Sequence, residues 1–170
     1  LFNGKNLDGW KPRHTDLPNG WVVKKGLLTN AEPGNDILTE QTFDDFKLEA
    51  QFRYPEESNS GIYLRGRHEV QIEDNYGMII NSHRIGGVYG HLSPRINASR
   101  PAGKWQTLKI TLIGRVVTIE LNGEAIIERQ VIPGITGGAL DSDEGKPGPI
   151  LIQGDHGVVE FRKLVITPAR

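Results

Sequence analysis

The sequence predicts an all-β protein, and three observations carry that prediction. The 170 residues include 21 glycines and 10 prolines, which recur between short apolar runs at the spacing of turns in sandwiches and barrels. Within the runs, apolar and polar residues alternate as they do in half-buried strands. No stretch has the apolar periodicity of a helix, and no internal repeat is visible. About a dozen antiparallel strands in two sheets, with one face concave enough for a ligand, satisfy this pattern.

The first part of the chain predicts short elements. The opening holds two turn signals, Asn3-Gly4 and Asp8-Gly9, among aromatic and leucine anchors. Residues 21–28 predict a short hairpin closed by Lys24-Lys25, and residues 37–39 a short strand. From residue 46 to residue 54, apolar and polar side chains alternate without a break, which predicts a half-buried strand.

The centre of the chain, residues 59–74, reads NSGIYLRGRHEVQIED and contains two alternating runs separated by Gly66-Arg67. Side chains alternate between the faces of a strand, so each run has one apolar and one polar face. The expected polar faces carry Tyr63, Arg65, Glu69, Gln71 and Glu73. Large hydrogen-bonding groups of this kind suit a sugar-binding surface, although a water-facing sheet with charge pairs explains the pattern equally well.

The second half predicts the most regular strands. Residues 105–113 and 116–121 alternate, and Asn122-Gly123 turns the chain into residues 124–129, a strong hairpin signal. Two closing strands, residues 150–153 and 158–166, are expected on either side of the turn Gly154 to Gly157. Two long loops are predicted at residues 76–100 and 133–149. Loops of such length are often functional.

Composition limits the possible functions. The length suits a single domain over residues 1–170. With 20 basic and 21 acidic side chains and no basic cluster, electrostatically driven nucleic-acid binding is not expected. There is no cysteine, hence no disulfide framework, and no apolar run approaches the roughly 18 residues of a membrane span. The chain starts at Leu1 without a methionine, so we expect a trimmed chain whose targeting segment is missing.

Three segments carry a resemblance to a known family. Residues 1–10 (LFNGKNLDGW), residues 59–74 and residues 136–166 (TGGALDSDEGKPGPILIQGDHGVVEFRKLVI) resemble the 3-keto-disaccharide hydrolase family in the same order. The resemblance runs from Leu1 to about Ile166. It implies a concanavalin A-like β-sandwich (jelly roll) of two antiparallel sheets, in a periplasmic or secreted protein. The implied activity is cleavage of glycosides whose sugar carries a ketone at carbon 3.

The implied chemistry needs a base near carbon 2, a cation or hydrogen-bond donor for the enolate oxygen, and an acid for the leaving oxygen. We expect Glu69 or His156 to be the base and Arg65 to hold the enolate oxygen with its fork of donors. The expected substrate-binding residues are Asn59, Tyr63, Gln71, Asp74, Tyr89 and Gln153. Purely structural roles are the alternative: Arg65 can pair with Glu69 or Glu49, and His156 can fix its loop.

No cofactor is expected, and the partner is an oligosaccharide or glycoside substrate. The acidic run Asp141, Asp143 and Glu144 is too short for an EF-hand loop. Two other functions stay open. One is a retaining glycosidase of the laminarinase type, because Glu69 to Glu73 resembles its Glu-x-Asp-x-Glu strand with Gln71 at the aspartate. The other is a non-catalytic carbohydrate-binding module, which the same fold also hosts.

Overall fold

A computed structural model describes residues 1–169 of the chain; Arg170, the last residue of the predicted domain, lies outside them. The described chain forms twelve strands in two sheets and no helix, so the all-β prediction is confirmed. The strands are β1 (Trp10–Pro12), β2 (Trp21–Lys24), β3 (Leu27–Asn30), β4 (Ile37–Thr39), β5 (Phe46–Arg53), β6 (Asn59–Leu64), β7 (His68–Glu73), β8 (Gln106–Ile113), β9 (Val116–Leu121), β10 (Glu124–Val131), β11 (Leu151–Ile152) and β12 (Glu160–Pro168). Within residues 1–169 nothing helical is long and apolar enough to cross a membrane.

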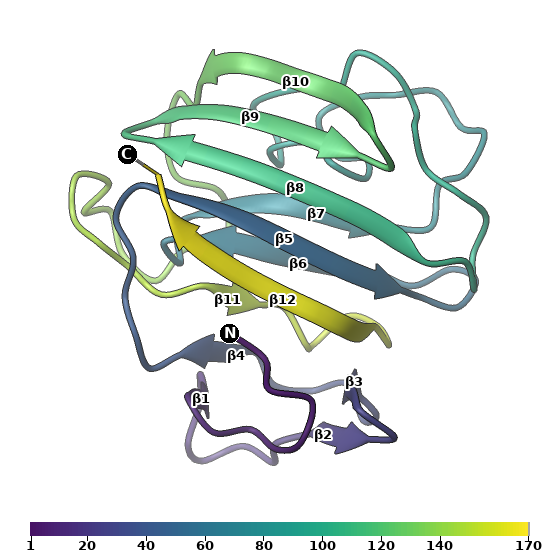
Figure 1. The fold of residues 1–170 in the computed structure, drawn as a ribbon, viewed down its shortest axis with the longest axis vertical. Helices are drawn as coiled ribbons and strands as arrows, with labels where there is room; N and C mark the ends of the chain where they lie inside the picture. Colours follow the sequence, from purple (N-terminus) through teal and green to yellow (C-terminus); the bar gives the residue numbers. More distant parts are fainter. Residues whose placement is uncertain (170) are drawn as a thin grey trace.

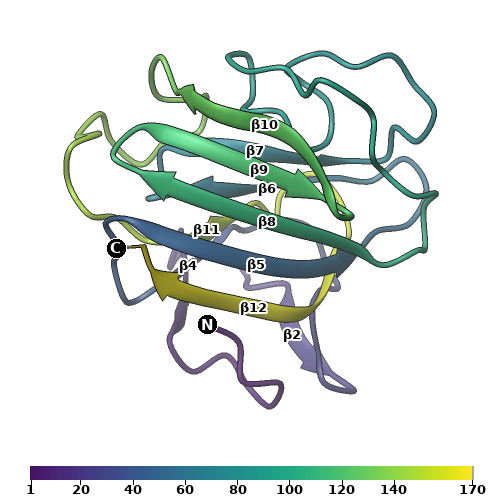
Figure 2. The same ribbon diagram turned by 45° about the horizontal axis from the view of Figure 1, so that its top comes forward.

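The two sheets stack as a jelly-roll sandwich. One has five strands in the order β1-β4-β11-β6-β7, and the other has seven in the order β10-β9-β8-β5-β12-β3-β2. Every pair of neighbouring strands is antiparallel. In Figure 1 and Figure 2 the long strands β5, β8, β9 and β12 lie in front of β6, β7 and β11. The predicted sandwich of two antiparallel sheets is therefore confirmed.

The core lies between the sheets and is built by the apolar faces that the alternation predicts. From the seven-stranded sheet, Phe52 and Phe161 are fully buried, and their ring centroids lie 5.8 Å apart. From the five-stranded sheet, Ile62, Val70 and Ile72 are also fully buried. Burial of each such side chain contributes about 1.5–3 kcal/mol to the free energy of folding. This core fixes which face of β6 and β7 points outward.

Turn chemistry sets the register of the hairpins. Asn122 and Gly123 both have positive φ, 54° and 92°, as a two-residue hairpin turn requires. The β2–β3 turn differs by one position from the prediction, since Lys25 and Gly26 are its positive-φ residues. The edge strand β1 was not predicted, because its three residues lie among turn signals and end in a proline.

Candidate functional site

A polar cavity of about 380 Å³ lies on the outer face of the five-stranded sheet. It is lined by seven of the nine residues that the sequence analysis assigned to the site: Asn59, Tyr63, Glu69, Gln71, Tyr89, Gln153 and His156. Five further lining residues were not assigned: Arg13, Asp36, Gly137, Gly138 and Asp155. The cavity thus gathers residues from the start, the middle and the end of the chain.

The register of β6, β7 and β11 brings the central residues together. Tyr63 pairs with Glu69 on one side and with Leu151 on the other, so their side chains share the outer face. Two residues earlier on β6, Gly61 pairs with Gln71, and the Gly61 carbonyl accepts a 2.9 Å hydrogen bond from the backbone N–H of Gln153. Side chains in register across antiparallel strands are close neighbours. The polar face predicted from alternation therefore becomes the floor of the cavity.

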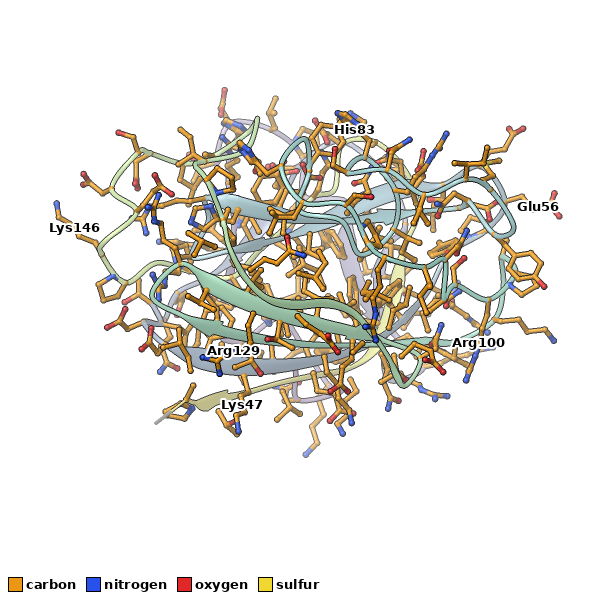
Figure 3. The ribbon with its side chains drawn as sticks, turned by 90° about the horizontal axis from the view of Figure 1, so that it is seen from above. Lys47, Glu56, His83, Arg100, Arg129 and Lys146 are labelled. Atoms are coloured by element: carbon orange, nitrogen blue, oxygen red, sulfur yellow. The ribbon has the colours of Figure 1, made fainter. Side chains whose placement is uncertain are left out.

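Tyr89 reaches the cavity from the long loop after β7. Its backbone N–H donates a 3.0 Å hydrogen bond to the carbonyl of Glu69, and Val88 bridges to Val70 with its side chain fully buried. The loop thus extends the sheet past β7 and sets the Tyr89 side chain beside Glu69. The rings of His83 and Tyr89 pack in a T-shaped arrangement, with centroids 4.6 Å apart. Figure 3 shows His83 beyond the outer side of the five-stranded layer, opposite Lys47 and Arg129.

Gly61 makes room for the Glu69 carboxyl. A Cβ at position 61 would lie 2.3 Å from Glu69 Oε1 and 2.9 Å from its Cγ. Real Cβ atoms do not approach so closely, so the carboxyl occupies the space that any side chain at position 61 would take. Glycine is therefore required at this position because the Glu69 side chain fills the space of a Cβ, and not because of the backbone conformation.

Glu69 is a buried acid with a perturbed pKa. Its side chain is 5% exposed, and desolvation raises its pKa to about 7. The hydrogen bond from Tyr63 and the charge of His156 act in the opposite direction, while the charges of Asp36 and Asp155 raise the pKa further. A carboxyl group with a pKa near neutrality exchanges protons readily at physiological pH.

The Tyr63 hydroxyl has two acceptors but one proton. It lies 3.0 Å from Glu69 Oε2 and 3.0 Å from the carbonyl oxygen of Gly137. Burial, followed by the charge of Glu69, raises the pKa of Tyr63 well above its usual range, so the phenol stays protonated. When Glu69 is ionised, Tyr63 can donate to it. When Glu69 is protonated, it can donate to Tyr63, whose proton then turns to Gly137.

Two amides that line the cavity have buried side-chain oxygens without a hydrogen-bond partner in the described chain. Gln71 is 2% exposed and Gln153 is half-buried, and neither side-chain oxygen has a hydrogen-bond partner among residues 1–169. Buried polar atoms normally find partners. Because both amides line the cavity, a ligand with hydroxyl groups can satisfy them.

At the mouth of the cavity, Nδ1 of His156 forms a short hydrogen bond with Asp155 Oδ1. Both side chains are about half exposed, 55% and 51%. The carboxylate orients the imidazole, leaving Nε2 to face a ligand or solvent. His156 is the second group in the cavity that can take and give a proton.

Arg13 and Asp36 also line the cavity. Nη1 of Arg13 lies 3.1 Å from Asp36 Oδ2 and donates a 2.9 Å hydrogen bond to the carbonyl of Gly138. The other oxygen of Asp36 accepts a 2.9 Å hydrogen bond from the backbone of Gly154. One carboxylate thus fixes both an arginine and the turn that carries Asp155 and His156. Arg13 and Asp36 were not predicted as site residues, because neither lies in an alternating run; the one available signal is that Asp36 directly precedes the predicted strand 37–39.

The structure does not bring Arg65 to the cavity. Strand β6 ends at Leu64, and Arg65 has a positive φ of 53° in the turn to β7, so the alternation that placed it beside Tyr63 ends one residue earlier. Its side chain is 2% exposed and bonds to Asp44 and Asp45, with Nη2 2.9 Å from Asp45 Oδ1. Neither Glu69 nor Glu49 is its partner.

Asp74 also lies outside the cavity. It follows the end of β7, and its Oδ2 accepts a 3.0 Å hydrogen bond from the backbone of Glu57. It lines a separate surface depression with Tyr76 and Met78. Its structural role is to fix the turn between β5 and β6.

The acidic run in the 133–149 loop is engaged by basic side chains. Both oxygens of Asp141 bond to Arg67, at 2.6 and 3.2 Å, and Asp143 pairs with Lys146. Glu144 lies 3.6 Å from His68 and 3.8 Å from Arg115. Within residues 1–169, no three acidic or histidine side chains are arranged to hold a metal ion.

The fold and the cavity define a concanavalin A-like sandwich with a polar, acid-containing site on its outer sheet. Comparison with known families identifies the chain more closely. The model of the 3-keto-alpha-glucoside-1,2-lyase-like domain matches residues 1–167. The chain therefore belongs to this family.

Individual relatives agree with that assignment. A 3-keto-disaccharide hydrolase from Bacteroides thetaiotaomicron is 22% identical over 165 residues, covering 75% of this chain and 57% of that protein. The chain thus matches little more than half of that relative. A crystal structure of a candidate glycosyl hydrolase from Parabacteroides distasonis superposes with a TM-score of 0.82 and 28% identity, covering 99% of this chain and 82% of the other.

More distant structures share the fold alone. A carbohydrate-binding module from Bacillus subtilis has a TM-score of 0.65 at 14% identity, with 98% of this chain and 99% of the other covered. A family GH16 endo-β-1,3(4)-glucanase has a TM-score of 0.58 at 10% identity, with 97% and 86% covered. The concanavalin A-like fold is therefore confirmed.

Proposed function

We propose that this protein is an exported enzyme that cleaves glycosides oxidised at carbon 3, by proton abstraction at carbon 2 and departure of the group on carbon 1. The family match supports the substrate class. The observation that carries the chemistry is Glu69, a buried carboxyl with a pKa raised to about 7 on the floor of a polar cavity.

The ketone makes this reaction accessible to a carboxylate. An oxygen of Glu69 takes the proton from carbon 2, the C–H electron pair forms the C2=C3 bond, and the carbonyl π pair moves to oxygen. Collapse of this enolate restores the ketone, forms the C1=C2 bond and breaks the C1–O bond. The leaving oxygen takes the departing pair and a proton from protonated His156. The products are an alcohol and an unsaturated keto sugar, and addition of water to C1=C2 gives net hydrolysis.

The remaining lining residues suit a sugar. The unpartnered oxygens of Gln71 and Gln153 accept hydrogen bonds from sugar hydroxyls, and Asn59 adds a further amide. Tyr89, 37% exposed, offers a ring face at the rim. These groups position the substrate, and such positioning accounts for a large part of catalysis.

Two observations weigh against the rival functions. The laminarinase-type arrangement takes its second carboxylate from Glu73 on the same strand, but Glu73 does not line the cavity and pairs with Arg84, with both of its oxygens 3.0 Å from Nη1. A binding platform stacks sugars on several exposed aromatic rings, but of the two described aromatic residues that line the cavity only Tyr89 is exposed, at 37%, while Tyr63 is buried. Trp10 and Trp21 are buried, and Trp105 lies against the guanidinium groups of Arg53 and Arg162.

Replacement of Glu69 tests the proposal. We expect Glu69→Gln to lower kcat on a 3-keto-glucoside by about 100-fold or more, because the amide cannot take a proton. The control is Glu56→Gln, since Glu56 is exposed at one end of the molecule (Figure 3) and is expected to leave turnover unchanged. Wild-type turnover by Glu69→Gln would remove Glu69 from the mechanism.

A further inference from the structure

The proposed reaction places negative charge on the ketone oxygen, and the structure offers a cation for it other than the expected Arg65. We propose that Arg13 binds the oxygen on carbon 3 and stabilises the enolate. This inference rests on the proposed function, and it assigns a catalytic role to a residue that the sequence analysis did not single out.

The position of Arg13 supports this role. It is one of two basic side chains that line the cavity, and the other, His156, is needed for proton transfer. The carbonyls that accept hydrogen bonds from Arg13 and Tyr63 belong to consecutive residues, Gly138 and Gly137. The guanidinium therefore lies close to the Tyr63–Glu69 pair, and its charge lowers the pKa of Tyr63.

Arg13 has hydrogen-bonding capacity left for a ligand. Both of its bonds to described residues use Nη1, leaving the donors of Nε and Nη2 without a partner in residues 1–169. The side chain lines the cavity and is 23% exposed. A guanidinium stays charged at any working pH and presents its donors in a rigid fork, which suits an oxyanion.

Asp36 acts as a positioning residue for Arg13. Its carboxylate is 11% exposed and is held by Arg13 on one oxygen and by the Gly154 amide on the other. The guanidinium is thereby held in place before substrate arrives. Preorganised donors stabilise a transition state better than mobile ones, because they need not reorient during the reaction.

The role makes a specific kinetic prediction. An interaction that strengthens as charge develops on the ketone oxygen lowers the barrier more than it strengthens substrate binding. We expect Arg13→Met to lower kcat on methyl 3-keto-glucoside by about 100-fold or more, with KM changed by less than about threefold. Arg13→Lys, which keeps the charge but loses the fork, should lose about tenfold in kcat.

The experiment measures kcat and KM for wild type, both Arg13 variants and the surface control Arg95→Met. Arg95 pairs with Glu128 outside the cavity, and both side chains are 56% exposed. A wild type inert toward the keto glycoside overturns the proposed function and the role of Arg13 with it. An active wild type with kcat unchanged in Arg13→Met, or with a loss confined to KM, overturns the role of Arg13 alone. Should Arg13→Met fail to fold, the kcat of Arg13→Lys decides in the same way.

Discussion

The hydroxyl of Tyr63 lies 3.0 Å from Glu69 Oε2 across the β6–β7 pair and 3.0 Å from the carbonyl oxygen of Gly137. This shared proton ties the ionisation of Glu69 to the loop that forms one wall of the cavity. When Glu69 is protonated, its O–H can donate to the Tyr63 oxygen while the Tyr63 O–H donates to the Gly137 carbonyl, so both groups keep a hydrogen-bond partner. The pair can therefore hold either protonation state of the acid.

Removing the hydroxyl should shift the pH dependence. The bond from Tyr63 lowers the pKa of Glu69, so Tyr63→Phe should raise it. A base must be ionised, so the rising limb of turnover against pH should have its midpoint at about 7 in wild type and about one unit higher in the variant. The measurement is kcat against pH, with Tyr76→Phe, at a side chain 57% exposed, as control. An identical profile for Tyr63→Phe would show that this bond does not tune the group that titrates.

Glu69 should also make stability depend on pH. Because its folded-state pKa is about 7 and its ordinary value is 4.5, the folded state binds more protons between these values. Stability should therefore fall as pH rises from 4.5 through 7. Glu69→Gln removes this cost. The free energy of unfolding of the variant minus that of wild type should therefore be more positive at pH 8 than at pH 4, by up to about 3 kcal/mol. Denaturant unfolding of both proteins at the two pH values measures it. A pH-independent difference would contradict the raised pKa.

Gly61→Ala should displace the Glu69 carboxyl while leaving Glu69 itself unchanged. The new methyl group would lie 2.3 Å from Glu69 Oε1, so the carboxyl must move from its position on the cavity floor. We expect kcat to fall about tenfold or more, since misplacement of about 1 Å costs up to 100-fold. Gly134→Ala is the matched control, because a Cβ there meets nothing within 4 Å and its φ is not positive. Equal activity of the two variants would contradict the packing argument.

Arg65 should prove structural. It is 2% exposed and donates to the Asp44 carbonyl and the Asp45 carboxylate at 2.9 Å each, so Arg65→Met should cost about 2–4 kcal/mol in unfolding free energy. Its kcat/KM, measured on folded protein, should stay within about threefold of wild type. Denaturant unfolding and steady-state kinetics on one preparation separate the two effects. A large loss of kcat with unchanged stability would restore the catalytic role first expected for Arg65.

The sequence predicted those features of the fold and site that depend on neighbouring residues in the chain. Alternation and the Asn122-Gly123 turn are local, and they located β8, β9 and β10 closely. Alternation also placed Tyr63, Glu69 and Gln71 on one outward face. It failed at Arg65, because a tight turn with positive φ ended the strand, and nothing in the local pattern marks the last residue of a strand.

The part of the site that Arg13 and Asp36 form could not be predicted from the local sequence. Arg13 and Asp36 come together because β1 pairs with β4 and β4 with β11, a long-range order that alternation does not encode. The burial that raises the pKa of Glu69 likewise depends on loops distant in sequence. Residue type alone was enough to choose the candidate residues, but the fold is needed to show which of them line the same cavity.

The most direct test compares a 3-keto-glucoside with its unoxidised parent and with the keto compound deuterated at carbon 2, followed by NMR. We expect cleavage of the keto compound, slower cleavage of the deuterated one, and no cleavage of the parent, because only the ketone makes the carbon 2 proton acidic. Equal cleavage of the parent, or saturable binding of the keto compound with no product over hours, would contradict this expectation.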